Sequence, residues 1–182
     1  MSIKKIKKRA WPYIKNFRTY IDVGASIGNT CIPLIHEFNK IVAFEPNPYS
    51  FEKLKTNEKI KSYNIALSNK KGMAKLTVPF LNPEHGSIAE KRKKLWKDTT
   101  ASYDVLTETL DSFNLQDVDF LKVDVEQGEL EVFQGSIQTI KQSKPMIMFE
   151  NKRNENKNVI TFLQELGYNY VKTKSDVYAF II

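Results

Sequence analysis

Residues 20–29 read Tyr-Ile-Asp-Val-Gly-Ala-Ser-Ile-Gly-Asn, and the fold class can be predicted from this segment outward. Two apolar residues flank Asp22, two glycines follow four residues apart, and apolar residues at helical spacing come next. This order predicts a strand, a tight turn and a helix over about residues 28–38, with the N-terminal amides of the helix facing a ligand. Glycine at positions 24 and 28 would let the backbone approach that ligand closely.

A second acid stands where a nucleoside site needs one. Glu45 ends the apolar run at residues 41–44, 21 residues after Gly24. An acid at the end of the second strand can accept hydrogen bonds from the two ribose hydroxyls. The two features together predict a nucleoside cofactor. The glycine spacing lacks the Gly-x-Gly-x-x-Gly pattern of dinucleotide-binding turns, so a cofactor without a pyrophosphate fits better.

Length and composition indicate one globular domain. The chain has 182 residues, of which 41% are hydrophobic, enough to build one core. The sequence contains neither an apolar run long enough to span a membrane nor a signal-like apolar stretch after the first lysines. Cys31 is the single cysteine and cannot form an internal disulfide. We therefore expect a cytoplasmic protein.

The net charge of +7 belongs to the first 18 residues. This segment carries seven basic residues and no acid, and the rest of the chain has 21 basic and 21 acidic residues. Residues 1–18 are thus predicted to form a basic N-terminal helix or arm. Its charge suits contact with nucleic acid, acidic lipid or an anionic substrate. The simpler interpretation, which we favour, is a leading helix whose apolar side packs on the fold.

Strand and helix patterns alternate along residues 19–182, which we expect to form a single domain. The alternation predicts an α/β fold with a doubly wound, mostly parallel sheet. A third strand is expected to end at residues 65–67. The last two strands, at about 168–172 and 177–182, follow each other without a helix and predict an antiparallel hairpin. Residues 79–102 lack periodicity and are predicted to form a lid-like loop.

Ligands of such sheets bind at the carboxyl ends of the strands. The pattern places five residues at those ends: Asp22, Glu45, Ala66, Asp124 and Glu150. Within the predicted nucleoside site, the backbone from Gly24 to Gly28 would lie against the amino-acid part of the cofactor. Glu45 would hold the ribose, and Ala66-Leu67 would lie near the adenine.

The apolar strand at residues 118–125 ends in acids, which is the second candidate site. Acids at the exit of such a strand need an explanation, because a buried unpaired charge is costly. Asp124 is the first candidate to accept a hydroxyl proton, and Glu126 is the second. His85 is a third catalytic candidate if its loop covers the site. Asp124 with Glu150-Asn151 also offers the oxygen ligands that Mg²⁺ prefers, although we favour an acceptor-orienting role for Asp124 without a metal.

Five segments resemble the successive motifs of FkbM-type methyltransferases, and these are residues 21–29, 43–48, 64–68, 121–135 and 145–150. The resemblance extends over residues 20–182. It implies a Rossmann-like class I methyltransferase fold, S-adenosylmethionine as methyl donor, and O-methylation of a sugar, glycan or related polyol. One position departs from the family: Gln127 follows Glu126 where a glycine is common, and glycine comes one residue later.

The complete set of predicted cofactor-binding residues is Asp22, Gly24, Ala25, Ser26, Gly28, Asn29, Glu45, Pro46, Asn47, Ala66, Leu67 and Asp124. The predicted acceptor is a small molecule or a glycan. The segments outside the resemblance, residues 1–18 and 79–102, are the ones we expect to choose it.

Two other functions compete with this one. An RNA 2′-O-methyltransferase would use the basic N-terminus and the run Lys91–Lys97 to track phosphates. Its characteristic lysine–aspartate–lysine–glutamate set would need Lys122, Asp124, Lys152 and Glu150, whose order and spacing do not fit, so nucleic acid is not the expected partner. A non-catalytic cofactor-binding protein is the other alternative, and the acids at the strand exit argue against it.

Overall fold

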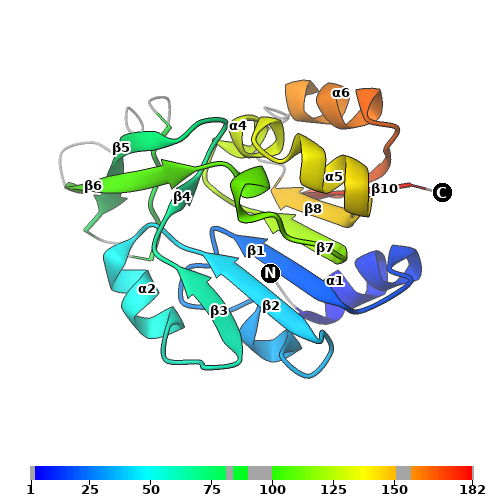
Figure 1. The fold of residues 1–182 in the computed structure, drawn as a ribbon, viewed down its shortest axis with the longest axis horizontal. Helices are drawn as coiled ribbons and strands as arrows, with labels where there is room; N and C mark the ends of the chain where they lie inside the picture. Colours follow the sequence, from blue (N-terminus) through cyan, green and yellow to red (C-terminus); the bar gives the residue numbers. More distant parts are fainter. Residues whose placement is uncertain (1–2, 81–83, 90–99, 151–156, 182) are drawn as a thin grey trace.

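The computed structural model describes residues 3–80, 84–89, 100–150 and 157–181 (Figure 1). A seven-stranded sheet with the order β3-β2-β1-β7-β8-β10-β9 forms its centre. Its strands are β1 (Thr19–Val23), β2 (Lys40–Phe44), β3 (Ile60–Tyr63), β7 (Val118–Val123), β8 (Met146–Glu150), β9 (Asn169–Lys172) and β10 (Asp176–Phe180). The pairs among β3, β2, β1, β7 and β8 are parallel, and β10 runs antiparallel to both of its neighbours. The mostly parallel sheet with a C-terminal antiparallel hairpin is therefore confirmed.

Helices cover both faces of this sheet. One face carries α1 (Ile3–Ala10), the short 3₁₀ helices η1 (Trp11–Tyr13) and η2 (Ile32–Leu34), and α2 (Pro48–Leu54). The other carries α4 (Glu129–Gln134), α5 (Ile137–Ser143) and α6 (Lys157–Glu165), with the 3₁₀ helix η3 (Leu110–Phe113) (Figure 1). Side chains alternate between the faces along each strand. Tyr20 and Phe120 pack toward α1, whereas Ile21 and Leu121 pack toward α4 and α5.

A separate three-stranded sheet has the order β4-β6-β5. It consists of β4 (Ala66–Leu67), β5 (Gly72–Pro79) and β6 (Thr100–Glu108). The prediction that the third strand of the main sheet ends at residues 65–67 is thus wrong. β3 already ends at Tyr63, the Asn64 side chain bonds the carbonyls of Glu45 and Pro46, and β4 then pairs with β6 instead.

The segment predicted as a lid-like loop, residues 79–102, is only partly described. β6 begins inside it at Thr100, and residues 81–83 and 90–99, which include the basic run Lys91–Lys97, lie outside the described residues. Residues 84–89 are described. Within them Ser87 forms an isolated antiparallel bridge with Thr77 of β5, so this part of the segment lies beside the second sheet.

The helix predicted over residues 28–38 is replaced by turns and the three-residue η2. Pro33 removes one amide donor, and several remaining bonds, such as Leu34 N to Cys31 O at 2.9 Å, span three residues rather than four. Cys31, Leu34 and Phe38 are nevertheless buried, as their spacing suggested. The apolar pattern predicted which side chains point inward but not the backbone hydrogen bonds.

The N-terminal helix α1 packs on the fold through Ile6 and Ala10, both fully buried, while Lys4, Lys5 and Lys8 are exposed. Among the described residues, no helix is both long and apolar enough to cross a membrane.

Candidate active site

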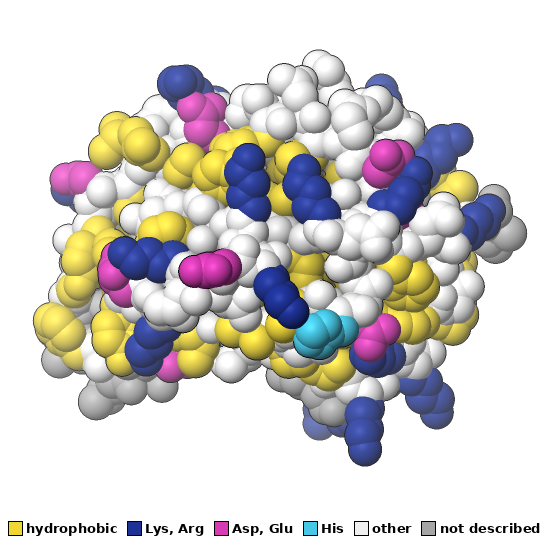
Figure 2. All heavy atoms as spheres, turned by 60° about the horizontal axis from the view of Figure 1, so that its bottom comes forward, with side chains coloured by type: hydrophobic (Ala, Val, Ile, Leu, Met, Phe, Trp, Pro, Cys, Tyr) yellow, Lys and Arg dark blue, Asp and Glu magenta, His cyan; other side chains and the backbone are white. Residues whose placement is uncertain are grey.

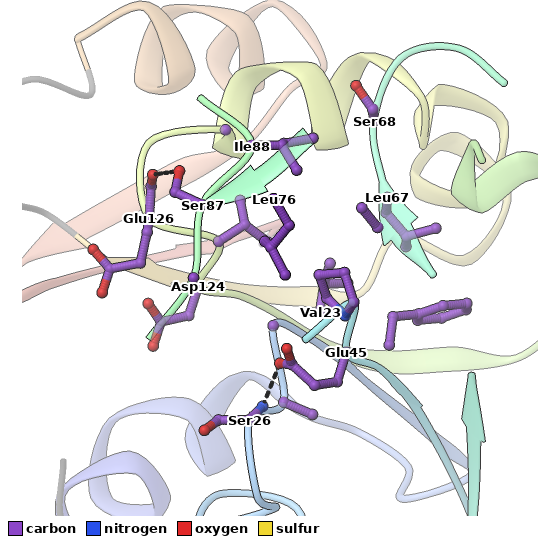
Figure 3. Close-up of a pocket in the computed structure, with 18 of the residues that line it drawn as sticks. Val23, Ser26, Glu45, Leu67, Ser68, Leu76, Ser87, Ile88, Asp124 and Glu126 are labelled. Atoms are coloured by element: carbon purple, nitrogen blue, oxygen red, sulfur yellow. Dashed lines mark hydrogen bonds between the residues drawn. The ribbon is translucent and has the colours of Figure 1, made fainter. Parts of the chain in front are cut away.

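A pocket of about 630 Å³ lies at the carboxyl ends of β1, β2 and β7 (Figure 3). Its wall includes the turn after β1, the residues after β2, strand β4, residues 84–89 and the turn after β7. Eleven predicted site residues line it, namely Gly24, Ala25, Ser26, Asn29, Glu45, Pro46, Ala66, Leu67, His85, Asp124 and Glu126. The volume is within the range of pockets that hold a cofactor-sized ligand.

The turn after β1 lies directly on the exit of β7. Gly24 has φ +75°, and a Cβ atom there would lie 2.0 Å from the carbonyl oxygen of Asp124. The amides of Gly24 and Ala25 both donate to the carbonyl of Phe44, at 2.9 and 3.2 Å. Glycine is therefore required for two reasons: the left-handed backbone and the contact with the neighbouring strand exit.

Glu45 joins this turn to the start of α2. Its Oε2 accepts from the amide of Ser26 at 2.7 Å, and its Oε1 accepts from the amide of Asn47 at 2.8 Å (Figure 3). The residue is 6% exposed, and burial raises the pKa of its carboxyl to about 7 although both amides act in the opposite direction. The carboxylate thus forms part of the pocket wall and also fixes the backbone around it.

Beneath the pocket lies a buried ion pair between neighbouring strands. Lys122 Nζ is 2.9 Å from Asp22 Oδ1 and 3.6 Å from Asp124 Oδ2. Burial raises the pKa of Asp22 against the attraction of Lys122. Burial alone would lower the pKa of Lys122, but Asp22 and Asp124 raise it above its ordinary value. Lys122 therefore links the first acid of the glycine motif to the acid at the exit of β7.

Three carboxyl groups gather at the exits of β7 and β8. Asp124, Glu126 and Glu150 each offer an oxygen, and these oxygens lie within 4.8 Å of one another. Asp124 is partly exposed at the pocket, and Figure 3 shows its carboxylate beside that of Glu126. The third predicted metal ligand, Asn151, lies outside the described residues.

Four predicted site residues do not line the pocket but lie close to it. Asp22 pairs with Lys122, and Gly28 closes the turn through its amide to the carbonyl of Ala25. Asn47 caps α2 by accepting from the amide of Tyr49 at 3.1 Å. Glu150 belongs to the carboxylate group described above.

The roof of the pocket is the part that the sequence did not reveal. Leu76 of β5 and Ser87 and Ile88 of the following segment line it (Figure 3). Ser87 and Ile88 come from the segment without periodicity, so no pattern marked them as pocket residues. The pairing of Lys122 could have been predicted, because a lysine inside an apolar strand needs a buried acid as its partner.

The strand order and the position of the pocket define a Rossmann-like class I methyltransferase fold. A Methylobacillus flagellatus KT structure described as Methyltransferase FkbM matches with a TM-score of 0.64 and 16% identity, over 91% of this chain and 44% of that one. The family model of the Methyltransferase FkbM domain matches residues 22–170, and the chain belongs to this family. It spans less than half of the length of the Methylobacillus protein.

Two further solved structures share the fold. A precorrin 8W decarboxylase from Methanobacterium thermoautotrophicum has a TM-score of 0.56 and 14% identity, over 98% of this chain and 88% of that one. A Streptococcus mutans protein described as a methyltransferase in complex with SAH has a TM-score of 0.55 and 10% identity, over 100% and 98%. No curated protein sequence matches the chain.

Proposed function

We propose that this protein transfers a methyl group from S-adenosylmethionine to a hydroxyl group of a sugar, glycan or related polyol. The observation that carries the proposal is the Asp124 carboxylate, which is partly exposed in a cofactor-sized pocket directly beside the Gly24 turn. Membership of the FkbM family supports the donor, as does the SAH held by the Streptococcus protein of the same fold.

The donor half of the pocket is proposed to use the residues after β1, β2 and β3. The backbone from Gly24 to Gly28 would lie against the amino-acid part, and Ala66 and Leu67 near the adenine. Glu45 would accept the ribose hydroxyls. Each of its carboxylate oxygens accepts one backbone amide and keeps acceptor capacity for a hydroxyl.

Bound in this pocket, the donor supplies a methyl group already activated on a sulfonium. The acceptor oxygen would bond to this methyl carbon as the carbon–sulfur bond breaks, and the sulfur would leave as a neutral thioether. The chain has two tasks. Alignment of the acceptor can lower the barrier by up to roughly 7–11 kcal/mol. We propose that the Asp124 carboxylate, which lies beside Glu126, takes the hydroxyl proton. Such proton transfer typically raises the rate about 10²–10⁴-fold.

The charge of the pocket favours an acceptor without phosphate. Five carboxyl side chains line it: Glu45, Glu84, Asp124, Glu126 and Glu131. Lys122, one of the two lysines there, is already paired with acids. Such a lining repels a phosphate backbone. On the face shown in Figure 2, the described Lys and Arg side chains are spread among acidic and apolar ones. Both observations favour a polyol over RNA.

The proposed mechanism requires no metal. The carboxylates of Asp124, Glu126 and Glu150 would suit Mg²⁺, which could orient the acceptor hydroxyl and make it more acidic. Methyl transfer from a sulfonium does not need that assistance, and acidic residues alone do not make a metal site. Turnover measured in EDTA and in added Mg²⁺ separates the two cases: we expect equal rates, and a rate that depends on Mg²⁺ would assign the carboxylates to the metal.

The test combines donor binding with methyl transfer. Calorimetry with S-adenosylmethionine should give saturable binding, and labelled donor should methylate at least one member of a panel of sugars, glycans, nucleotide-sugars and RNA. Asp124→Asn should abolish turnover while donor binding persists, whereas Asp104→Asn, an exposed position on β6, should change neither. Absence of donor binding would refute the proposal, methylation of RNA alone would favour the RNA function, and binding without turnover would favour a non-catalytic protein.

A further inference from the structure

The turn after β7 has an unusual backbone. Glu126 has φ +57° and Gln127 has φ +82°, so two consecutive residues with side chains occupy the left-handed region. Side chains disfavour this region, because Cβ comes too close to the backbone. The turn nevertheless determines where the Glu126 carboxylate lies, next to those of Asp124 and Glu150. Contacts with other groups must therefore stabilise it.

Ser87 provides such a contact from the roof of the pocket. Its hydroxyl donates to the carbonyl oxygen of Glu126 at 2.6 Å, and the residue is 2% exposed (Figure 3). The backbone of Ser87 is itself held by Thr77 of β5 through two hydrogen bonds of 3.0 Å. The Ser87 hydroxyl also accepts from the amide of Ala89 at 3.1 Å, which fixes its direction.

The other end of the same segment is attached to the donor side of the pocket. Ser26, in the turn after β1, donates its hydroxyl to the carbonyl of Glu84 at 3.2 Å. The Glu84 carboxylate also lies 3.7 Å from Lys53 of α2. Residues 85–89, which include the Ser87 attachment, line the pocket. The segment therefore connects the wall next to the donor with the turn that carries Glu126.

We propose that Ser87 is a positioning residue for methyl transfer: its hydroxyl holds the left-handed turn at Glu126 and Gln127 and so keeps the Glu126 carboxylate beside Asp124. Without this bond the turn can relax toward negative φ, which moves the Glu126 carboxylate away from the acceptor oxygen. The inference rests on the proposed function for the roles of the two acids, but the hydrogen bond and the backbone conformation do not depend on it.

The first experiment measures the contact in the protein without ligand. Urea unfolding of Ser87→Ala should show an unfolding equilibrium constant raised about tenfold, since a buried carbonyl loses a hydrogen bond. Ser87→Thr keeps the hydroxyl and should retain most of the wild-type stability. Ser102→Ala, at an exposed position on β6, is the matched control and should behave as wild type. Without the bond, the wild-type turn can relax and recover its strain, whereas a Gln127→Gly background has less strain to recover, so Ser87→Ala should cost clearly more stability there than in the wild-type background.

The second experiment separates positioning from stability. Ser87→Ala should lower kcat about tenfold and leave the dissociation constant of S-adenosylmethionine within twofold of wild type, and Ser87→Thr should recover kcat. The inference would be overturned if Ser87→Ala kept the wild-type kcat and the wild-type stability in urea. It would also be overturned if Ser87→Ala lost the same stability with glutamine and with glycine at position 127. If wild type neither binds the donor nor turns over, the proposed function fails, and the unfolding measurements still decide whether Ser87 holds the turn.

Discussion

Gly24 is the position where one added methyl group should do the most damage. Gly24→Ala would place a Cβ atom 2.0 Å from the carbonyl oxygen and 2.8 Å from the carbonyl carbon of Asp124. Both atoms are backbone and cannot swing aside. The same substitution also forces a side chain into a backbone with φ +75°. Either the turn after β1 or the exit of β7 must therefore move.

The magnitude follows from these two contributions. A left-handed backbone costs a residue with a side chain about 1–2 kcal/mol. An overlap with packed backbone costs about 1–3 kcal/mol more. We expect the free energy of unfolding to fall by roughly 2–5 kcal/mol, which for a domain of this size lowers Tm by roughly 4–20 °C. Donor binding should also weaken at least tenfold, because the displaced turn and Asp124 both line the pocket.

Two other glycines separate the contributions. Gly167→Ala tests conformation alone, since φ is +87° and no described atom outside its immediate neighbours lies within 4 Å of the added Cβ. Gly135→Ala tests the clash alone, since φ is −81° and its Cβ would lie 2.1 Å from the carbonyl oxygen of Ser68. Thermal unfolding should rank Gly24→Ala as the least stable, and Gly167→Ala should keep wild-type donor affinity. Equal Tm and donor affinity for Gly24→Ala and Gly167→Ala would show that the contact between Gly24 and Asp124 adds no cost.

Three further predictions concern stability. Lys122→Met should lower the free energy of unfolding by about 3–5 kcal/mol, because it leaves Asp22 buried without its cation. In urea unfolding, the double variant Asp22→Asn with Lys122→Met should regain most of that loss. An unchanged free energy of unfolding in Lys122→Met would contradict a stabilising role of the ion pair. Burial raises the pKa of Glu45 to about 7 from 4.5, so the folded state holds a proton there that the unfolded chain releases. The resulting stability is complete below about pH 4.5 and is lost as the pH rises through about 7, up to roughly 3 kcal/mol. Glu45→Gln should therefore show a smaller decline between pH 5 and 8 than wild type, and parallel curves would argue against it. Gln127→Gly should be more stable than Gln127→Ala by about 1 kcal/mol, because both variants lack the glutamine side chain and differ in their tolerance of φ +82°. Equal unfolding midpoints of the two variants would show that the turn is relaxed.

The order of the main elements was predictable because it depends on local patterns. Alternating strand and helix periodicities and the terminal pair of strands could be recognised from neighbouring residues alone. The helix expected over residues 28–38 was wrong because apolar spacing specifies burial, whereas Pro33 and the short-range bonds specify the backbone. The second sheet was missed because β4 and β6 are about forty residues apart in the chain.

The candidate site likewise contains residues that local patterns predicted and residues that they did not. Residues at strand exits, such as Glu45 and Asp124, were predictable because parallel strands end at one edge of the sheet. Asp22, one of the predicted donor-binding residues, also pairs with Lys122 on the neighbouring strand, and a single motif does not reveal that pairing. The proposed role of Ser87 could not be predicted from the sequence, because it depends on a hydrogen bond to the backbone carbonyl of Glu126, 39 residues away in the chain.

The attachment of the pocket roof has a consequence for how this chain can change by mutation. Ser26 and Ser87 both bond main-chain carbonyls, of Glu84 and Glu126, and a carbonyl is present whatever side chain an evolving gene encodes at those positions. Apart from Ser87 itself, mutations can therefore alter the side chains of residues 85–89 that line the pocket and leave these two hydrogen bonds intact. Under the proposed function, a new acceptor would then require single substitutions rather than rebuilding of the domain.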